Sequence, residues 1–441
     1  MKRLFLLITM ASAALMAEAG GLMTNTNYHI AFDRMFARGA TLEIDGAYSN
    51  PAGLVWGHEG LQLSLNFQKP WQNRDIETDI PSFMGSNFHQ KYNGKASAPI
   101  VPALFASYVK DRWAVSTMIG IVGSGGFVKY DEGVPMFTVP VTAMLGQSGQ
   151  TPDKYVMDAQ MKGKQYIYGA QVSFAYKITD FLSAAVGMRA NYYDGYYKGH
   201  VTATLKQPEL QLVGLQLDCV QKGWGFNPIL SLDYHQERLT LAARYEFRAK
   251  INVPNDTKTL DAAISGKTPA EVQAAFGSKI AAYQDGVKTR YDMPSLLVLA
   301  AGYEFTTKLR AALEYHFFDD KNAKMAGNRQ DELKHGTHEV LLGAEYDIND
   351  KFTVSCGGQR TDYGLSDTYQ ANTSFACDSY SVGLGGAVNL TEKIRLNVSY
   401  FCSIYSKYKV ENANYLGLPF AGSDTYSRTN HVIGLGLDYK F

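Results

Sequence analysis

The stretch "LQLSLNF", Leu61 to Phe67, carries an apolar side chain at every second position. Successive side chains of a β-strand point to opposite faces, so the three leucines and Phe67 share one face. Gln62, Ser64 and Asn66 share the other face. The pattern predicts a strand that separates an apolar environment from a polar one.

The same alternation recurs along most of the remaining chain. It is found near 100–110, 113–130, 166–178, 181–205, 211–234, 238–253, 291–305, 308–319, 337–348, 351–362, 378–390, 393–410 and 426–441. With the first stretch this makes fourteen segments, an even number. The 29 Tyr, 22 Phe and 41 Gly also favour many strands and tight bends, so the chain is predicted to be all-β.

The connections between these segments are of two kinds. Short polar turns occur at 110–112, 179–180, 235–238, 306–308, 349–350 and 391–393, and long connections at 69–99, 131–165, 254–290, 320–336, 363–377 and 411–425. The stretch 194–210 fits neither kind clearly. Short and long connections that take turns are typical of outer-membrane barrels, with short periplasmic turns and long extracellular loops.

A soluble β-sandwich or propeller would also have alternating strands. Several segments here are longer than the usual globular strand, and a tilted membrane-crossing strand needs about 9 to 11 residues. The last segment, "HVIGLGLDYKF", alternates up to the terminal Phe441, as in the C-terminal signature of bacterial outer-membrane proteins. We therefore predict a 14-stranded antiparallel transmembrane β-barrel, in residues 58–441, with long extracellular loops.

The N-terminal residues have the pattern of an export signal. Lys2 and Arg3 are followed by an apolar core and an Ala-Glu-Ala cleavage site, which predicts a signal peptide over 1–19. Residues 20–57 lack sustained alternation and precede the first strand. They start on the periplasmic side and could fold back into a lumen too wide to fill with wall side chains. We expect this segment to be a hatch that plugs the barrel, with both termini periplasmic.

The signal peptide, the small-residue N-terminal segment, "NPAG" at Asn50, Pro51, Ala52 and Gly53, the fourteen strands and the final Phe resemble the FadL/TodX family of outer-membrane hydrophobic-compound transporters. The resemblance implies that Asn50 to Gly53 lie in the hatch. It also implies passive, ligand-gated uptake of long-chain fatty acids or other hydrophobic compounds, without cofactor, metal or catalytic residues.

Glycines interrupt the third strand in "IGIVGSGGFVKY". Gly123, Gly125 and Gly126 predict a bulge or a close backbone approach, although simple curvature would need glycines too. In the family that the chain resembles, this strand is kinked inward and leaves a lateral opening to the membrane. The resemblance implies the same role for the three glycines.

The alternation also predicts which charged residues face the lumen. If Tyr245 and Phe247 face lipid, then Arg244, Glu246 and Arg248 face the lumen. The same reasoning applies to Arg189, Arg310, Glu314 and Arg395. Arg189, Arg244 and Arg310 are candidates for binding a ligand carboxylate, but ladders of salt bridges that stiffen the lumen would look the same.

The amino-acid composition limits the kinds of partner that the protein can bind. The 42 basic and 42 acidic residues balance, so nothing indicates nucleic acid, and no basic block for anionic lipid stands out. The four cysteines form no C-x-x-C pair, and their spacing leaves disulfide pairing open. We expect a monomer that meets a hydrophobic ligand, outer-membrane lipids and the barrel-assembly machinery in the bacterial outer membrane.

Three other functions are compatible with parts of this pattern. A general diffusion porin would not need a long segment before its first strand. An outer-membrane lipase-type enzyme is not supported by a G-x-S-x-G or H-E-x-x-H signature. An adhesin could use the long loops and also transport.

Overall fold

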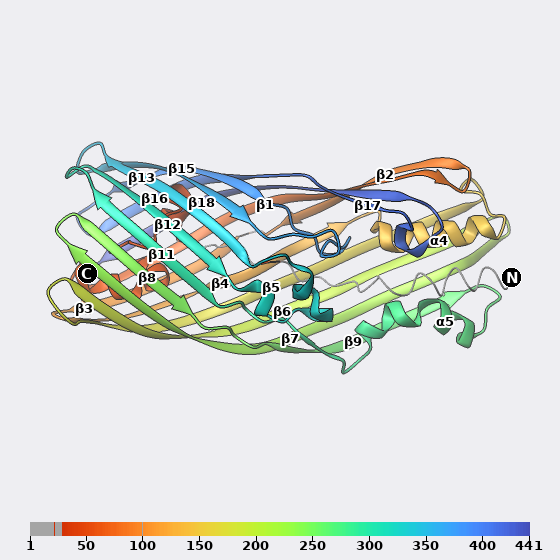
Figure 1. Cartoon of the computed structure of the whole chain (residues 1–441), viewed down its shortest axis with the longest axis horizontal. Coiled ribbons are helices and arrows are strands. Elements are labelled where there is room, and N and C mark those ends of the chain that lie inside the picture. Colours follow the sequence, from red (N-terminus) through yellow and green to blue (C-terminus); the bar gives the residue numbers. More distant parts are fainter. Residues whose placement is uncertain (1–21, 23–28, 99) are drawn as a thin grey trace.

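The fold is a closed antiparallel β-barrel of 14 spanning strands, as predicted. The computed structural model describes Leu22 and residues 29–98 and 100–441. The predicted signal peptide and the first part of the predicted hatch therefore lie outside the described residues. Figure 1 shows a long barrel with tight turns at one end, called here the short-turn end, and loops and helices at the other, the long-loop end.

Hydrogen bonding divides the strands into 18 segments, because some spanning strands are interrupted. β2 and β3 together form one spanning strand, β8 and β9 form a second, and β10 and β11 form a third. β17 is a short segment that pairs with β18. Pairing of β1 with β18 closes the barrel. The segments are β1 (Gly60–Phe83), β2 (Ser86–Ser97), β3 (Val101–Lys110), β4 (Trp113–Tyr130), β5 (Tyr155–Lys177), β6 (Leu182–Lys206), β7 (Glu209–Gln236), β8 (Leu239–Glu246), β9 (Asn252–Ile264), β10 (Lys288–Arg290), β11 (Leu296–Glu304), β12 (Leu309–Phe318), β13 (Thr337–Asp347), β14 (Phe352–Asp362), β15 (Ser379–Asn389), β16 (Ile394–Tyr405), β17 (Tyr408–Asn412) and β18 (Gly422–Lys440).

The wall has the two faces that the alternation predicts. On β1, Leu61, Leu65 and Phe67 are 36%, 43% and 39% exposed, whereas Ser64 and Asn66 are 1% and 0% exposed. Apolar side chains face outward because lipid is their solvent, and polar side chains bond to one another inside. The short turns were also predicted correctly, and the ambiguous stretch 194–210 is a tight hairpin between Lys206 and Glu209.

Three predicted loops are largely regular structure. The range 69–99 contains the end of β1 and all of β2, and the range 131–165 contains a helix and the first residues of β5. The range 254–290 contains most of β9, a second helix and β10. These extensions stand beyond the apolar band, so their outer face is polar and the alternation that marks a membrane strand fades. Arg248 was also misplaced: β8 ends at Glu246, and Arg248 is exposed.

Helices occur in the hatch and at the long-loop end. The hatch contains α2 (Ile30–Met35), α3 (Gly46–Ser49) and the 3-10 helix η2 (Pro51–Trp56). The loops carry α4 (Pro135–Gln147), α5 (Pro269–Ile280), η3 (Ala281–Tyr283), η4 (Asp320–Asn322), η5 (Ala326–Glu332) and η6 (Tyr415–Gly417). α5 lies within the long connection 254–290. Within the described residues, no helix combines the length and apolar character needed to cross a membrane.

Residues 29–57 lie inside the barrel at the short-turn end (Figure 1). α2 contacts β13 to β16, β18 and β1, and η2 contacts β3 to β7, so the segment reaches both sides of the wall. The predicted hatch is therefore present in the lumen. The four cysteines are all free, which answers the question of pairing that the sequence left open.

Candidate functional site

The Asn-Pro-Ala-Gly corner of the hatch is held by hydrogen bonds of the Asn50 side chain. Asn50 is fully buried, and its side-chain oxygen accepts a hydrogen bond from the Gly53 N–H (3.3 Å). Its Nδ2 donates to the Thr41 carbonyl (3.1 Å) and to Asp233 Oδ2 on β7 (2.6 Å). Pro51 begins η2, where its missing N–H costs nothing. Asn50 thus shapes the turn and ties it to the wall.

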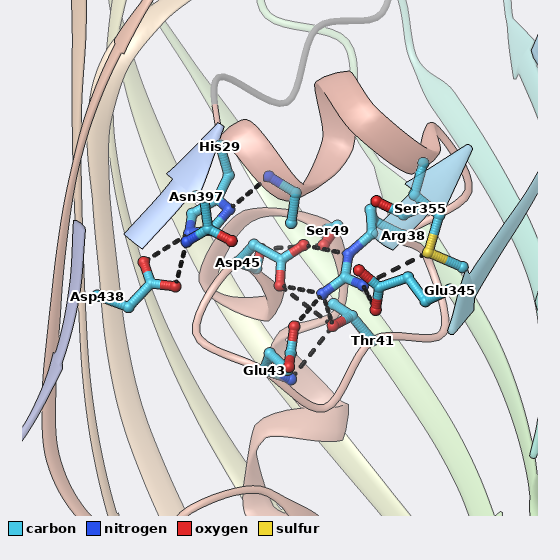
Figure 2. A network of polar contacts seen from close by, with 12 residues as sticks. His29, Arg38, Thr41, Glu43, Asp45, Ser49, Glu345, Ser355, Asn397 and Asp438 are labelled. Carbon is cyan, nitrogen blue, oxygen red and sulfur yellow. Dashed lines mark hydrogen bonds and ion pairs between the residues drawn. The ribbon is translucent and has the colours of Figure 1, made fainter. Parts of the chain in front are cut away.

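Arg38 organises the polar core of the hatch (Figure 2). Its Nε and Nη2 donate to the two carboxylate oxygens of Asp45 at 2.7 and 2.8 Å. Nη2 also donates to Thr41 Oγ1 and Glu43 Oε2, both at 2.7 Å. Such bidentate, charge-assisted bonds hold the loop between α2 and α3 in one shape.

Ionic contacts join this core to the barrel wall. Glu345 of β13 pairs with Arg34 of α2, and both side chains are fully buried. Glu345 also receives Arg310 of β12 at 2.7 Å, and Arg395 of β16 pairs with Glu43 of the hatch at 2.9 Å. The hatch is therefore bound to the wall through fixed charges.

The three arginines nominated as ligand-binding residues face inward but are already paired. Arg189 makes a bidentate bond to Glu246, both distances 2.7 Å. Arg244 lies 2.9 Å from the same carboxylate, and Arg310 pairs with Asp347 as well as with Glu345. This arrangement matches the alternative of salt bridges that stiffen the lumen.

Two other arginines lie unpaired in a lumen cavity. Arg74 of β1 and Arg428 of β18 are direct partners in the strand register. Neither forms an ion pair within the described part of the chain, and the Nε of each is buried without a hydrogen-bond partner. Arg428 stacks over the Tyr405 ring at 4.7 Å. Two facing cations without a counter-charge are suited to bind an anion.

The walls of this cavity are mixed. Beside the two guanidinium groups it is lined by apolar and aromatic side chains, including Leu22, Ile121, Phe127, Phe375, Phe401 and Val432. Sequence reasoning missed Arg74 because its segment was taken for a loop. The alternation of β1, continued past Phe67, would have placed it on the inner face.

The third spanning strand, β4, is irregular where its glycines cluster. Its register against β5 shifts between Ile121 and Gly123 and again between Ser124 and Gly126. Gly126 has a φ of +75°, a conformation that favours glycine. Gly123 and Gly125 belong to the same irregular stretch.

On its other side β4 loses its partner strand. The pairing with β3 ends at Leu104↔Ile119, and pairing with β2 begins only at Ala96↔Val128. We call the unpaired interval between these two pairs the β4 gap. The cavity that holds Arg74 and Arg428 is lined by residues of both edges of the gap, among them Ala98 and Phe127.

A second hollow lies at the long-loop end between α4, α5 and the extended strands β5, β6, β7 and β9. Its lining is mostly apolar and includes Met136, Phe137, Val141, Leu217, Leu260 and Phe276. Such a surface suits an apolar ligand.

Among the described residues, the one group of side chains spaced to hold a metal ion is Glu77, Asp79 and His89 on the β1–β2 hairpin. These side chains are at least partly solvent-accessible, and His89 Nδ1 lies 2.5 Å from Asp79 Oδ1. Acidic groups with a histidine partner of this kind are common on protein surfaces, so the group does not indicate a catalytic centre.

Fold and interior together define a class: an outer-membrane β-barrel that holds a folded N-terminal segment in its lumen. A sequence profile for the outer membrane protein beta-barrel domain matches residues 260–441. A search of curated protein sequences found no significant match.

The fold is similar to those of several solved structures. The chain is similar to a FadL homologue of Pseudomonas aeruginosa, with a TM-score of 0.71 and 13% identity over 96% of this chain and 100% of that one. It is also similar to the toluene transporter TodX of Pseudomonas putida, with a TM-score of 0.60 and 12% identity over 96% and 100%. The toluene transporter TbuX of Ralstonia pickettii matches with a TM-score of 0.51 and 14% identity over 96% and 99%. The resemblance to FadL/TodX proteins is confirmed at the level of the fold.

Proposed function

We propose that this protein carries long-chain fatty acids, or similar amphiphilic molecules with an apolar tail, across the bacterial outer membrane by passive, ligand-gated diffusion. The long-loop end faces outward and both termini face the periplasm, as in barrels with this asymmetry of loops. Ligand enters at the apolar hollow beside α4, passes to the lumen cavity and leaves sideways through the β4 gap. The protein acts as a monomer and not as an enzyme.

One observation carries the proposal: a single cavity combines two unpaired arginines, apolar walls and the edges of the β4 gap. A carboxylate head would receive charge-assisted hydrogen bonds from Arg74 and Arg428. The apolar tail would lie against side chains such as Phe401 and Phe127 near the gap. The cavity therefore suits an amphiphile with one anionic end.

Sideways release is favourable for such a ligand. Each CH₂ group moved from water into an apolar medium contributes about 0.8 kcal/mol. A route through the short-turn end would instead take the tail past the hatch and its charges into the aqueous periplasm. The β4 gap offers a path to lipid without that cost.

The hatch distinguishes this proposal from a general porin. Arg34, Arg38 and Glu43 hold it in the lumen through ion pairs with the wall or within its own core. A porin needs an open lumen for small polar solutes. We therefore expect the protein to exclude sugars.

The test is uptake of labelled oleate, oleyl alcohol and a small sugar by cells that lack their own fatty-acid transporter and produce this barrel. Arg74→Gln with Arg428→Gln should reduce oleate uptake about tenfold or more, because each charged hydrogen bond contributes about 1.5 to 3 kcal/mol. Uptake of the uncharged alcohol should change little. The control Arg112→Gln with Arg238→Gln removes two exposed arginines of the short turns.

The lateral route is tested separately with Gly126→Val. A β-branched residue is strained at the φ of Gly126, so β4 should shift toward a regular strand and uptake of both lipids should fall. The control Gly163→Val changes the neighbouring strand, where a new Cβ would meet only Val128 at 3.8 Å. Sugar entry through the unmodified protein would favour the porin, and undiminished lipid uptake in Gly126→Val would exclude the β4 route.

A further inference from the structure

Four lysines form one row across four neighbouring strands. Lys95 of β2 pairs with Lys129 of β4, Lys129 pairs with Lys162 of β5, and Lys162 pairs with Lys198 of β6. We call this set the lysine row. Direct partners on adjacent strands carry their side chains on the same face, so the four ammonium groups lie side by side.

The lysine row lies on the outer face of the barrel. Residues that flank it on these strands, such as Tyr92, Tyr130, Met161 and Tyr197, are buried in the interior, and the lysines point the other way. Lys95 is exposed, and the Lys198 side chain is 44% exposed. The row is therefore open to molecules around the barrel.

The acidic groups nearby neutralise only part of this charge. Lys129 pairs with Asp131, and Lys198 pairs with Asp218 at 2.8 Å. Lys95 and Lys162 form no ion pair with any described residue. Since like charges directly opposite one another destabilise a sheet, the row has an electrostatic cost that these two acids do not remove.

Basic neighbours extend the row toward the membrane. Lys164 lies beside Lys162 on the same face, with its ammonium 5.2 Å from the Tyr196 ring and 2.6 Å from Asp194. The Lys198 ammonium also lies near the Tyr196 ring, 5.4 Å from its centroid. The surface thus combines ammonium groups with aromatic rings.

An aromatic band marks the membrane boundary below the row. Tyr168, Tyr192 and Trp224 lie side by side across β5, β6 and β7, with neighbouring ring centroids 6.5 and 4.8 Å apart. Such rings lie at the level of lipid headgroups. Lys162 and Lys198 follow them on the same strands, about 20 Å further along at the usual rise per residue. The row therefore lies at the height of a large headgroup rather than of acyl chains.

We propose that the lysine row binds the phosphate groups of a phosphorylated glycolipid in the outer leaflet. This inference rests on the proposed orientation, in which the long-loop end faces outward. A partner protein or a nucleic acid would not account for a basic row placed directly above an aromatic membrane band. Bound phosphates would supply the missing counter-charge for Lys95 and Lys162.

The position of the row gives such a lipid a role in transport. Lys95 and Lys129 are the pair next to Ala96↔Val128, where the pairing of β4 resumes beyond the β4 gap. A glycolipid held there covers the outer rim of the gap and keeps the gap below the headgroup layer. Ligand leaving the lumen then enters hydrocarbon and not the aqueous phase.

The experiment measures binding of bisphosphorylated lipid A, and of the same lipid with its phosphates removed, to the full-length barrel in detergent by native mass spectrometry. Lys95→Gln with Lys162→Gln should weaken binding of the bisphosphorylated lipid about tenfold or more, since each basic group near anionic lipid contributes substantially. The control Lys321→Gln with Lys334→Gln removes the same charge from exposed loops at the same end.

Folding of each variant is checked by its heat-modifiable migration on gels, so that loss of binding is not loss of the barrel. Equal affinity for the dephosphorylated lipid, or an equal effect of the control, would overturn the proposal. So would competition by inorganic phosphate at concentrations like those of the lipid, because that result describes a simple anion site. None of these outcomes depends on uptake, so failure of the transport proposal would be seen separately.

Discussion

Docking of the hatch depends on Glu345, a fully buried charge that faces arginines from both the hatch and the wall. Arg34 is fully buried, and its other hydrogen bonds are to Ser355 Oγ (2.7 Å) and Asn397 Oδ1 (3.4 Å), both neutral. Glu345→Gln keeps the shape of the side chain and removes the charge. Arg34 then remains buried without a counter-ion whenever the hatch is docked.

The size of the effect can be worked out in two ways. Two unit charges about 4 Å apart interact with about 4 kcal/mol at an effective dielectric constant of about 20. Removing one partner of a buried ion pair costs about 3 to 5 kcal/mol. Since 1.4 kcal/mol is a factor of ten, the ratio of docked to undocked hatch should fall about a thousandfold.

Hydrogen exchange measures this ratio directly. The amides of α2 and of Phe36, the residue that follows it and whose N–H donates to the Phe32 carbonyl, should exchange about a thousandfold faster in Glu345→Gln, with strand amides unchanged. Single-channel recordings should show more frequent open events. Glu304→Gln serves as the control, because Glu304 is exposed at the short-turn end and forms no ion pair within the described residues. An increase in exchange of less than about tenfold would refute the reasoning.

Three further predictions concern the hatch and the loops. A Cβ on Gly357 would lie 2.0 Å from the Met35 carbonyl oxygen, so Gly357→Val should displace α2 and expose the hatch to protease; an unchanged digestion pattern would contradict this. Burial raises the pKa of Asp320, which accepts the Thr337 N–H at 3.0 Å, from 3.8 to about 7. Between pH 3.8 and about 7 the Asp320 carboxyl is therefore protonated in the folded loop and ionised in the unfolded loop, so the free energy of unfolding of the loop should fall as pH rises. Asp320→Asn should abolish this pH dependence, measured as the exchange rate of the Thr337 amide. A retained pH dependence would show that another group is responsible. Thr268→Ala removes the capping box of α5 and with it about 1 kcal/mol of helix stability, so the amides of α5 should exchange several-fold faster. Equal exchange rates would mean that the cap is dispensable.

Local patterns in the sequence were enough to predict the wall of the barrel. Alternation of apolar and polar side chains is a property of each strand alone, and the lipid outside and the polar lumen inside select it residue by residue. The short turns were also predicted, because turn residues act over a few positions. Where strands leave the membrane, as in the second half of β1, the outer face is no longer apolar and the signal fades.

The candidate site depended on partners that sequence distance hides. Alternation placed Arg189, Arg244 and Glu246 on the inner face, but it did not show that both arginines pair with Glu246. That pairing depends on β7, which lies between β6 and β8 in the sheet. Arg74 and Arg428 come from opposite ends of the chain and meet where the barrel closes.

The lysine row is the clearest case of what only the tertiary structure decided. The sequence contains no basic block, since Lys95, Lys129, Lys162 and Lys198 lie on different strands. Strand register aligns them, and register is set by hydrogen bonding and packing of the whole sheet. The sequence by itself determined which side of the wall each residue faces, because that depends on a local period of two. The closed sheet decided which residues stand next to one another, because pairing depends on every strand between them.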